Sequence, residues 1–187
     1  AGKTTLVRHL LNHTPGDLNV GLITNTHSSL GHLLKWILHA YDVKPSGTDK
    51  ADMFQDFIDF LISQYASGKR VMLIVDEAQN LDIETLEELR VLSNINADKD
   101  MVLQMILVGQ PELRDTLSDP RLKQFAQRIV ADYHLNRLGP VDVKDYLEHR
   151  LGQAGASWQI FDEGAVAAIF HPSMGVPRLI NTLADMA

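Results

Sequence analysis

Apolar residues recur at two different spacings along this chain, and the two spacings alternate. Short, mostly apolar runs that are typical of buried strands cover residues 18–24, 70–75, 101–108 and 129–135. Apolar residues three and four apart, typical of amphipathic helices, cover 4–11, 29–41, 51–66, 82–95, 112–117 and 120–127. Because strands that alternate with helices pair in parallel, the pattern predicts an α/β domain with a parallel sheet flanked by helices on both faces.

The C-terminal part of the chain has a different pattern, with helices only. Helical spacing covers residues 141–153 and 162–171 and continues from 176 onward. We therefore predict two domains, an α/β domain over 1–138 and a small helical lid over 139–187, which the end at Ala187 truncates. The boundary falls near Leu138-Gly139-Pro140, where a glycine and a proline interrupt the periodicity.

The first five residues, AGKTT, match the end of a phosphate-binding loop of pattern G-x-x-x-x-G-K-S/T. In such a loop Gly2 lets the backbone approach the phosphates, and Lys3 neutralises the β- and γ-phosphates. Thr4 supplies a hydroxyl for Mg²⁺, and the amides that open the next helix, including that of Thr5, point at the phosphates. The front of the loop and its strand precede this sequence, so we expect the natural protein to extend upstream. A Gly-Lys-Thr before a helix also occurs by chance.

An apolar strand, VMLIV, ends in two acids, Asp76 and Glu77. Asp76 is expected to help hold Mg²⁺, and Glu77 is expected to orient or deprotonate the attacking water. A buried strand that merely ends in acids is the alternative, but it does not explain the Gly-Lys-Thr one strand and helix earlier. The two patterns together predict a site for ATP and Mg²⁺ and an ATPase.

Two further polar positions lie next to this predicted site. Gln110 follows the third predicted strand, at the same end of the sheet as Asp76, where ligands of open α/β sheets bind. We expect it to sense the γ-phosphate, although Gln-Pro is also ordinary turn chemistry. Gln79 and Asn80 are explained equally well as polar groups beside the site and as turn residues.

Three arginines are candidates for sensing or stabilising the charge of a triphosphate. Arg128, between a short helix and the fourth predicted strand, or Arg121 before it, could act as an arginine finger toward a neighbouring subunit. An exposed arginine in a surface salt bridge is the alternative for both. Arg178 opens a lid helix and could couple the lid angle to the nucleotide state.

Composition narrows the classes of partner. The chain has 187 residues, no cysteine and a formal net charge of −7. These values exclude disulfides and thiolate metal sites, fit a cytoplasmic location and provide no overall basic field for nucleic acid. No apolar run approaches the roughly 20 residues that a membrane-spanning helix needs.

Five segments, in this order, resemble the AAA+ ATPases of the ExeA/GspA group, which is associated with general secretion and envelope assembly: AGKTT, VMLIVDEAQNL, ILVGQPELR, QRIVADYHL and GVPRLIN. The resemblance covers essentially the whole chain. It implies a P-loop NTPase with a helical lid and a homo-oligomer whose sites lie between subunits. By position, Lys3, Thr4, Asp76 and Glu77 match the phosphate and magnesium motifs, Gln110 the first sensor, Arg128 the finger and Arg178 the second sensor.

The expected function is that of an ATP-hydrolysing motor or switch that acts on a secretion or envelope-assembly protein. We expect it in the cytoplasm or at the cytoplasmic face of the inner membrane. A nucleotide-dependent DNA adaptor like the AAA+ helpers of transposition is the alternative, disfavoured by the absence of a basic excess. An ATP-binding scaffold without turnover is a third possibility, against which Glu77 argues because a pure binder needs no base.

Overall fold

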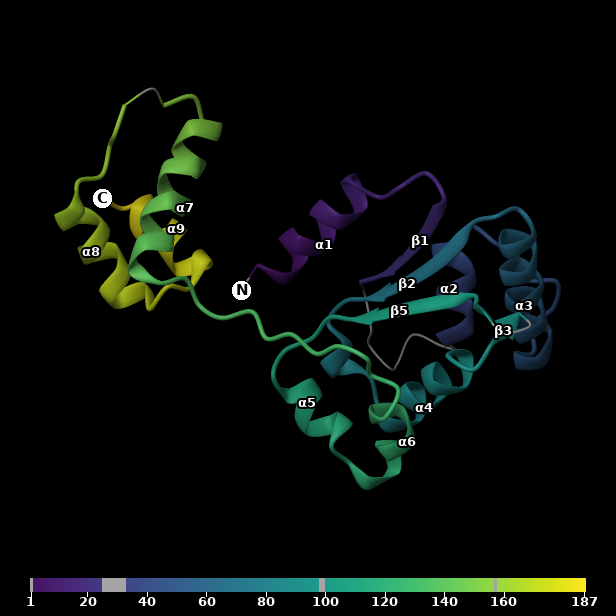
Figure 1. Ribbon diagram of the computed structural model, residues 1–187. Helices are drawn as coiled ribbons and strands as arrows, with labels where there is room; N and C mark the ends of the chain where they lie inside the picture. The colour runs from purple at the N-terminus through teal and green to yellow at the C-terminus, as the bar shows by residue number, and fades with distance from the viewer. Residues whose placement is uncertain (1, 25–32, 98–99, 157) are drawn as a thin grey trace. The chain divides into compact units, whose positions relative to one another are not determined.

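The computed structural model describes residues 2–24, 33–97, 100–156 and 158–187 of the chain. The chain forms two compact units (Figure 1). One unit consists of Val7–Asp132, and the other combines Ala1–Leu6 with Tyr133–Ala187. Residues 29–32, at the start of the second predicted helix, lie outside the described residues.

The larger unit is built on a parallel sheet of β1 (Leu18–Ile23), β2 (Arg70–Val75) and β5 (Leu103–Leu107) in the order β1-β2-β5. Gly21 pairs in register with Leu73, and Leu73 with Met105. The central strand β2 is almost completely buried from Val71 to Val75 except at Met72. The parallel sheet expected from the alternation of strands and helices is confirmed.

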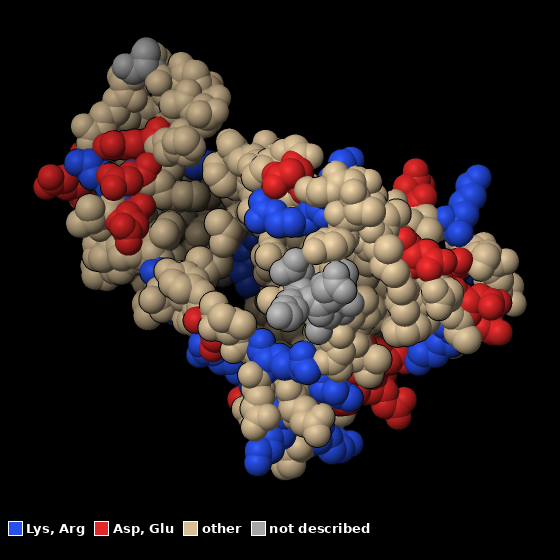
Figure 2. All heavy atoms as spheres, turned by 45° about the vertical axis from the view of Figure 1, so that its right-hand side comes forward, with Lys and Arg blue, Asp and Glu red and all other residues tan. Residues whose placement is uncertain are grey.

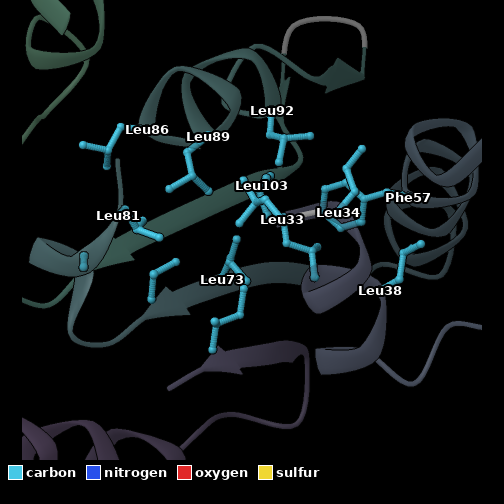
Figure 3. Packing of buried hydrophobic residues seen from close by; sticks show 14 of the residues in the cluster. Leu33, Leu34, Leu38, Phe57, Leu73, Leu81, Leu86, Leu89, Leu92 and Leu103 are labelled. Atoms are coloured by element: carbon cyan, nitrogen blue, oxygen red, sulfur yellow. The ribbon is translucent and has the colours of Figure 1, made fainter. Parts of the chain in front are cut away.

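Three helices supply most of the core of this unit: α2 (Leu33–Ala40), α3 (Lys50–Ala66) and α4 (Ile83–Leu92). Figure 3 shows leucines of α2 and α4, together with Phe57 of α3, gathered around Leu73 of β2 and Leu103 of β5. Phe57, Leu73, Leu86 and Leu89 are fully buried. This apolar packing stabilises the sheet and thereby places the ends of its strands.

Tyr41, in the turn after α2, lies against the sheet. Its hydroxyl donates a hydrogen bond to the carbonyl of Met72 at 2.7 Å. Its ring covers Gly21, where an added Cβ would stand 2.6 Å from the ring carbon Cζ. Burial raises the pKa of the Tyr41 phenol above its ordinary value. Gly21 therefore makes room for an aromatic ring whose hydroxyl is bonded to the neighbouring strand.

The polar residue before α4 caps this helix. The Asp82 carboxylate accepts the Thr85 backbone N–H at 2.8 Å. Hydrogen bonding from Thr85 holds the pKa of Asp82 below its usual value. The helix ends at Leu92, earlier than the sequence indicated, and is followed by the short antiparallel strands β3 (Asn96–Ala97) and β4 (Asp100–Met101), which the sequence did not predict.

The prediction of a fourth strand over residues 129–135 is wrong. After α5 (Glu112–Leu117), a 3₁₀ turn η3 (Pro120–Leu122) and α6 (Lys123–Ala126), the chain is irregular from residue 129 to 139. Val130 is 96% exposed and Tyr133 84% exposed. A strand exists only through hydrogen bonds to a neighbouring strand, and no described strand pairs with this segment. β-branched composition alone does not form a strand.

The second unit contains three helices with a separate apolar core: α7 (Pro140–Gln153), α8 (Glu163–Ser173) and α9 (Pro177–Ala184). Val143 and Ile180 are fully buried, and Leu147, Val166 and Ile169 are nearly so. Pro140 stands in the first turn of α7, and Asp142 accepts the Gly139 N–H at 2.9 Å. The helices expected in this part of the chain are present.

Within the described part of the chain, no helix has both the length and the apolar character needed to cross a membrane.

Candidate functional site

A buried carboxylate follows the central strand β2. The Asp76 N–H donates to the Ile23 carbonyl of β1 at 2.8 Å, so strand pairing continues one residue beyond β2. Asp76 is only 4% exposed, and its Oδ1 accepts the Glu77 N–H at 2.9 Å. Burying a carboxylate is costly unless it is hydrogen-bonded or paired with a cation. The sheet therefore holds an acid at the carboxyl end of its central strand.

The chain turns sharply at the second acid. Glu77 has φ 54° and ψ 36°, the left-handed conformation that residues other than glycine adopt rarely and that occurs often at functional sites. It leads into the 3₁₀ turn η2 (Ala78–Asn80). The Ala78 N–H donates to the Val108 carbonyl at 2.9 Å, so the turn is anchored to the segment after β5. Glu77 is thereby placed where β2 and β5 end.

Two glutamine side chains contact the Glu77 carboxylate. Gln79 Nε2 donates to Glu77 Oε2 at 2.7 Å, while Gln79 Oε1 accepts the Gln110 N–H at 2.9 Å. Gln110 Nε2 lies 3.5 Å from the same Glu77 oxygen. The structure thus brings together Glu77, Gln79 and Gln110, from the ends of two adjacent strands.

The absence of a side chain at Gly109 leaves room for the cluster of Glu77, Gln79 and Gln110. A Cβ at Gly109 would lie 2.7 Å from Leu113 Cδ2 and 3.2 Å from Gln79 Oε1. Sequence reasoning left Gln79 undecided between a turn residue and a site residue, and it did not single out Gly109. The sequence feature that could have indicated this part of the site is the Gly109-Gln110 pair, which follows a buried strand.

The remaining phosphate-loop residues open helix α1 (Lys3–Asn12). Gly2 has φ 97°, a conformation that favours glycine, and its carbonyl accepts the Leu6 N–H at 3.0 Å. Lys3 is half-buried, and Thr4 and Thr5 are exposed in the first helical turn. Amides at the start of a helix have no partner within it and lie at the positive end of its dipole. This geometry suits an anion such as phosphate.

The two finger candidates differ in their contacts. Arg121 forms a two-pronged ion pair with Asp119, with Nε–Oδ1 3.0 Å and Nη2–Oδ2 2.8 Å. The pair lowers the pKa of Asp119 to about 2 and raises that of Arg121. Arg128 follows α6, is exposed, and is anchored by its N–H to the carbonyl of the buried Phe125 at 2.9 Å. The guanidinium of Arg121 is thus engaged by its own chain.

Arg178 lies in the helical unit, in the first turn of α9, and its side chain is exposed. Pro177 precedes it at the first position of the helix, where a proline is well tolerated.

The acids at the end of β2 are suitable ligands for Mg²⁺ that is bound together with phosphate groups. Mg²⁺ usually keeps several waters and takes only one or two carboxylates together with phosphate oxygens. Asp76 provides such a buried carboxylate at a strand end. Over the described ranges there is no group of three His, Cys, Asp or Glu side chains that would hold a metal by itself. This carboxylate therefore suits Mg²⁺ that is bound together with a nucleotide.

A Gly-Lys-Thr that opens a helix and an acid pair that ends the central strand of a parallel sheet are the features of a P-loop NTPase. The sequence profile of the AAA domain matches residues 1–117, so the chain belongs to the AAA family.

General secretion pathway protein A of Aeromonas hydrophila is 40% identical to this chain over 187 residues. The match covers 100% of this chain and 34% of the relative, so the chain spans about a third of the length of that protein. The resemblance to the ExeA/GspA group of AAA ATPases is confirmed.

The fold is also found in solved structures of the Aeropyrum pernix ORC2 protein. The structure of its ADPNP-ADP complexes has a TM-score of 0.59 at 17% identity and covers 81% of this chain and 42% of that one. Its ADP form has a TM-score of 0.57 at 17% identity and covers 98% of this chain and 58% of that one. The predicted fold, a parallel AAA+ sheet flanked by helices with a helical C-terminal part, is confirmed.

Proposed function

We propose that this chain binds ATP with Mg²⁺ and hydrolyses it. The observation that carries the proposal is the Glu77 carboxylate, placed by a left-handed turn beside the buried Asp76 and next to Gln110. Two further observations support the proposal: the chain belongs to the AAA family, and it has a Gly-Lys-Thr before a helix.

The residues of this site have separate roles in the proposal. Lys3 neutralises the β- and γ-phosphates, and the amides of Gly2 and Thr5 face phosphate oxygens. Thr4 and Asp76 hold Mg²⁺, which when bound neutralises negative charge on the phosphate oxygens. Such positioning and charge stabilisation supply most of the catalysis in phosphoryl transfer.

Glu77 is the proposed general base that takes the proton of the attacking water. Gln110 orients the γ-phosphate through its side-chain amide, as expected for a polar residue at the end of the neighbouring strand. Arg178, at the start of α9, is the proposed second sensor, which would couple the helical lid of residues 139–187 to the nucleotide.

The proposal extends to a homo-oligomer in which Arg128 acts on the nucleotide of a neighbouring subunit. A finger residue must be exposed and held by a rigid neighbour, and Arg128 meets both conditions through its place after α6. The guanidinium of Arg121 already pairs with Asp119, which makes it the weaker candidate. A positive charge supplied by a neighbour stabilises the charge that develops during transfer.

The wider role that we propose is that of a motor or switch for a secretion or envelope-assembly protein, acting in the cytoplasm or at the cytoplasmic face of the inner membrane. It is supported by the similarity to General secretion pathway protein A over the whole chain. The net charge is −7, and acidic and basic side chains are interspersed on the face shown in Figure 2. This surface favours a protein partner over the DNA-adaptor alternative.

Two substitutions in the full-length protein test the proposed function. Lys3→Ala should weaken the binding of a fluorescent ATP analogue, because the phosphate charge loses its cation. Glu77→Gln should leave binding within about threefold and reduce phosphate release by roughly a hundredfold or more, the usual contribution of a general base. Glu84→Gln, which alters an exposed acid in the first turn of α4, is the matched control. Unchanged ATP affinity in Lys3→Ala, or a normal rate in Glu77→Gln, contradicts the proposal.

A further inference from the structure

We infer that Gln79 is a positioning residue that holds the Glu77 carboxylate and couples it to the loop that begins at Gln110. The inference rests on the proposed function, in which Glu77 is the base. It comes from one contact pattern: the two ends of a single side-chain amide are hydrogen-bonded to two different strand ends.

The amide of Gln79 is short and planar, so its two hydrogen bonds together set the separation of the groups that it joins. Nε2 donates to Glu77 Oε2 at 2.7 Å, and Oε1 accepts the Gln110 N–H at 2.9 Å. Both distances are typical of well-formed hydrogen bonds. A displacement of the backbone at Gln110 is therefore transmitted to the carboxylate.

The direct contact between Gln110 and Glu77 is the weaker link. Gln110 Nε2 lies 3.5 Å from Glu77 Oε2, the outer limit of a hydrogen bond. The bridge through Gln79 consists of two bonds that are each shorter. The bridge is therefore the stronger of these two links between Gln110 and the carboxylate.

The main chain around Gln79 supports the bridge. Ala78 is fully buried, and its N–H donates to the Val108 carbonyl at 2.9 Å. Gly109 carries no side chain, and a Cβ there would stand 3.2 Å from Gln79 Oε1. The main chain next to Gln79 is therefore anchored, and the absence of a side chain at Gly109 leaves room for the Gln79 amide.

The bridge has a consequence for the base. The two hydrogen bonds that fix the Gln79 amide also limit the orientations of the Glu77 carboxylate. A general base needs a fixed orientation in order to reach one particular water.

Gln79→Met removes both hydrogen bonds of the bridge, and the longer one from Nε2 to Asn80 Oδ1 at 3.4 Å, while keeping the length of the side chain. We expect kcat for ATP hydrolysis to fall about tenfold and KM for ATP to stay within about twofold, because the change affects the base and not nucleotide binding. Gln79→Glu, which replaces the donor to Glu77 with a second carboxylate, should lower kcat at least as far.

Gln55→Met is the matched control. Gln55 Nε2 donates to Asp59 Oδ1 at 2.8 Å on the exposed face of α3, so the substitution also removes an amide–carboxylate hydrogen bond. It should leave kcat unchanged. A kcat of Gln79→Met equal to that of the wild type overturns the inference.

A nucleotide-free measurement separates this inference from the proposed function. The Gln110 backbone amide, which donates to Gln79 Oε1, can be followed by ¹H–¹⁵N NMR in the wild-type protein and in Gln79→Met. A shifted amide resonance in the variant supports the bridge even if the wild-type protein fails to hydrolyse ATP, in which case only the proposed function fails. An unchanged resonance alongside normal wild-type hydrolysis overturns the bridge and leaves the proposed function standing.

Discussion

The backbone N–H of Leu138 donates to the carbonyl of Gly175 at 3.0 Å, and the two residues are in close contact. A Cβ added to Gly175 would stand 1.9 Å from the Leu138 carbonyl oxygen. Gly175 also has φ 71°, which disfavours any residue with a Cβ. The segment that enters α7 is therefore tied to the turn between α8 and α9 at a position that requires glycine.

Gly175→Ala should destabilise the helical unit. The left-handed conformation alone costs about 1–2 kcal/mol for a residue with a Cβ, and the clash with Leu138 adds to that cost. The free energy of unfolding can be measured by urea titration monitored by circular dichroism. Gly155→Ala is the control, because Gly155 also has a positive φ, 89°, but has no atom within 4 Å of an added Cβ. Equal losses in the two variants would show that the contact with Leu138 contributes nothing.

Arg128→Ala should retain ATP binding and lose most hydrolysis if this arginine acts on a neighbouring subunit. Removing an arginine finger lowers the rate by roughly a thousandfold or more in known cases. Mixing Arg128→Ala with Lys3→Ala subunits should restore part of the activity, because some sites then combine an intact phosphate loop with an intact arginine.

The mixed samples must be shown to be oligomeric by light scattering. Arg121→Ala is the comparison variant and should hydrolyse ATP near the wild-type rate, since Arg121 pairs with Asp119 of its own chain. Absence of recovery in mixed oligomers argues against a finger that acts between subunits.

Tyr41→Phe should lower the free energy of unfolding by about 1 kcal/mol near pH 8, because the hydrogen bond to the Met72 carbonyl is lost. Burial raises the pKa of Tyr41 above its ordinary value of 10.0. The stability contributed by the neutral phenol is therefore present below pH 10 and declines as the pH rises further, because the unfolded chain ionises first.

The difference between wild type and Tyr41→Phe should consequently shrink as the pH passes 10, and it should reverse by pH 11, where wild type has lost about 1.4 kcal/mol relative to the variant. Lysines also titrate in this range, so the comparison must be made between variants at each pH. Tyr133→Phe, at a residue that is 84% exposed, is the control and should show no such trend. A constant difference from pH 8 to 11 would contradict the assignment.

Much of the fold was predictable from local sequence. The spacing of apolar residues located β1, β2 and β5 and most helices. The failure at residues 129–135 has a clear cause: the apolar character of a strand is local, whereas the partner that completes its hydrogen bonds is not. The short pairing of β3 with β4 was missed for the same reason.

Local sequence patterns were enough to select the Gly-Lys-Thr at residues 2–4, the Asp76–Glu77 pair and Arg178 as candidate site residues, because each stands out by residue type and by its place next to a predicted strand or helix. Only the tertiary structure decided which of the polar residues meet. Gln79 and Gln110 are 31 positions apart, and they come together because β2 and β5 pair in parallel and end at the same edge. Local spacing does not encode contacts between strand ends, so the link from Gln79 to Glu77 and Gln110 became visible only in the folded chain.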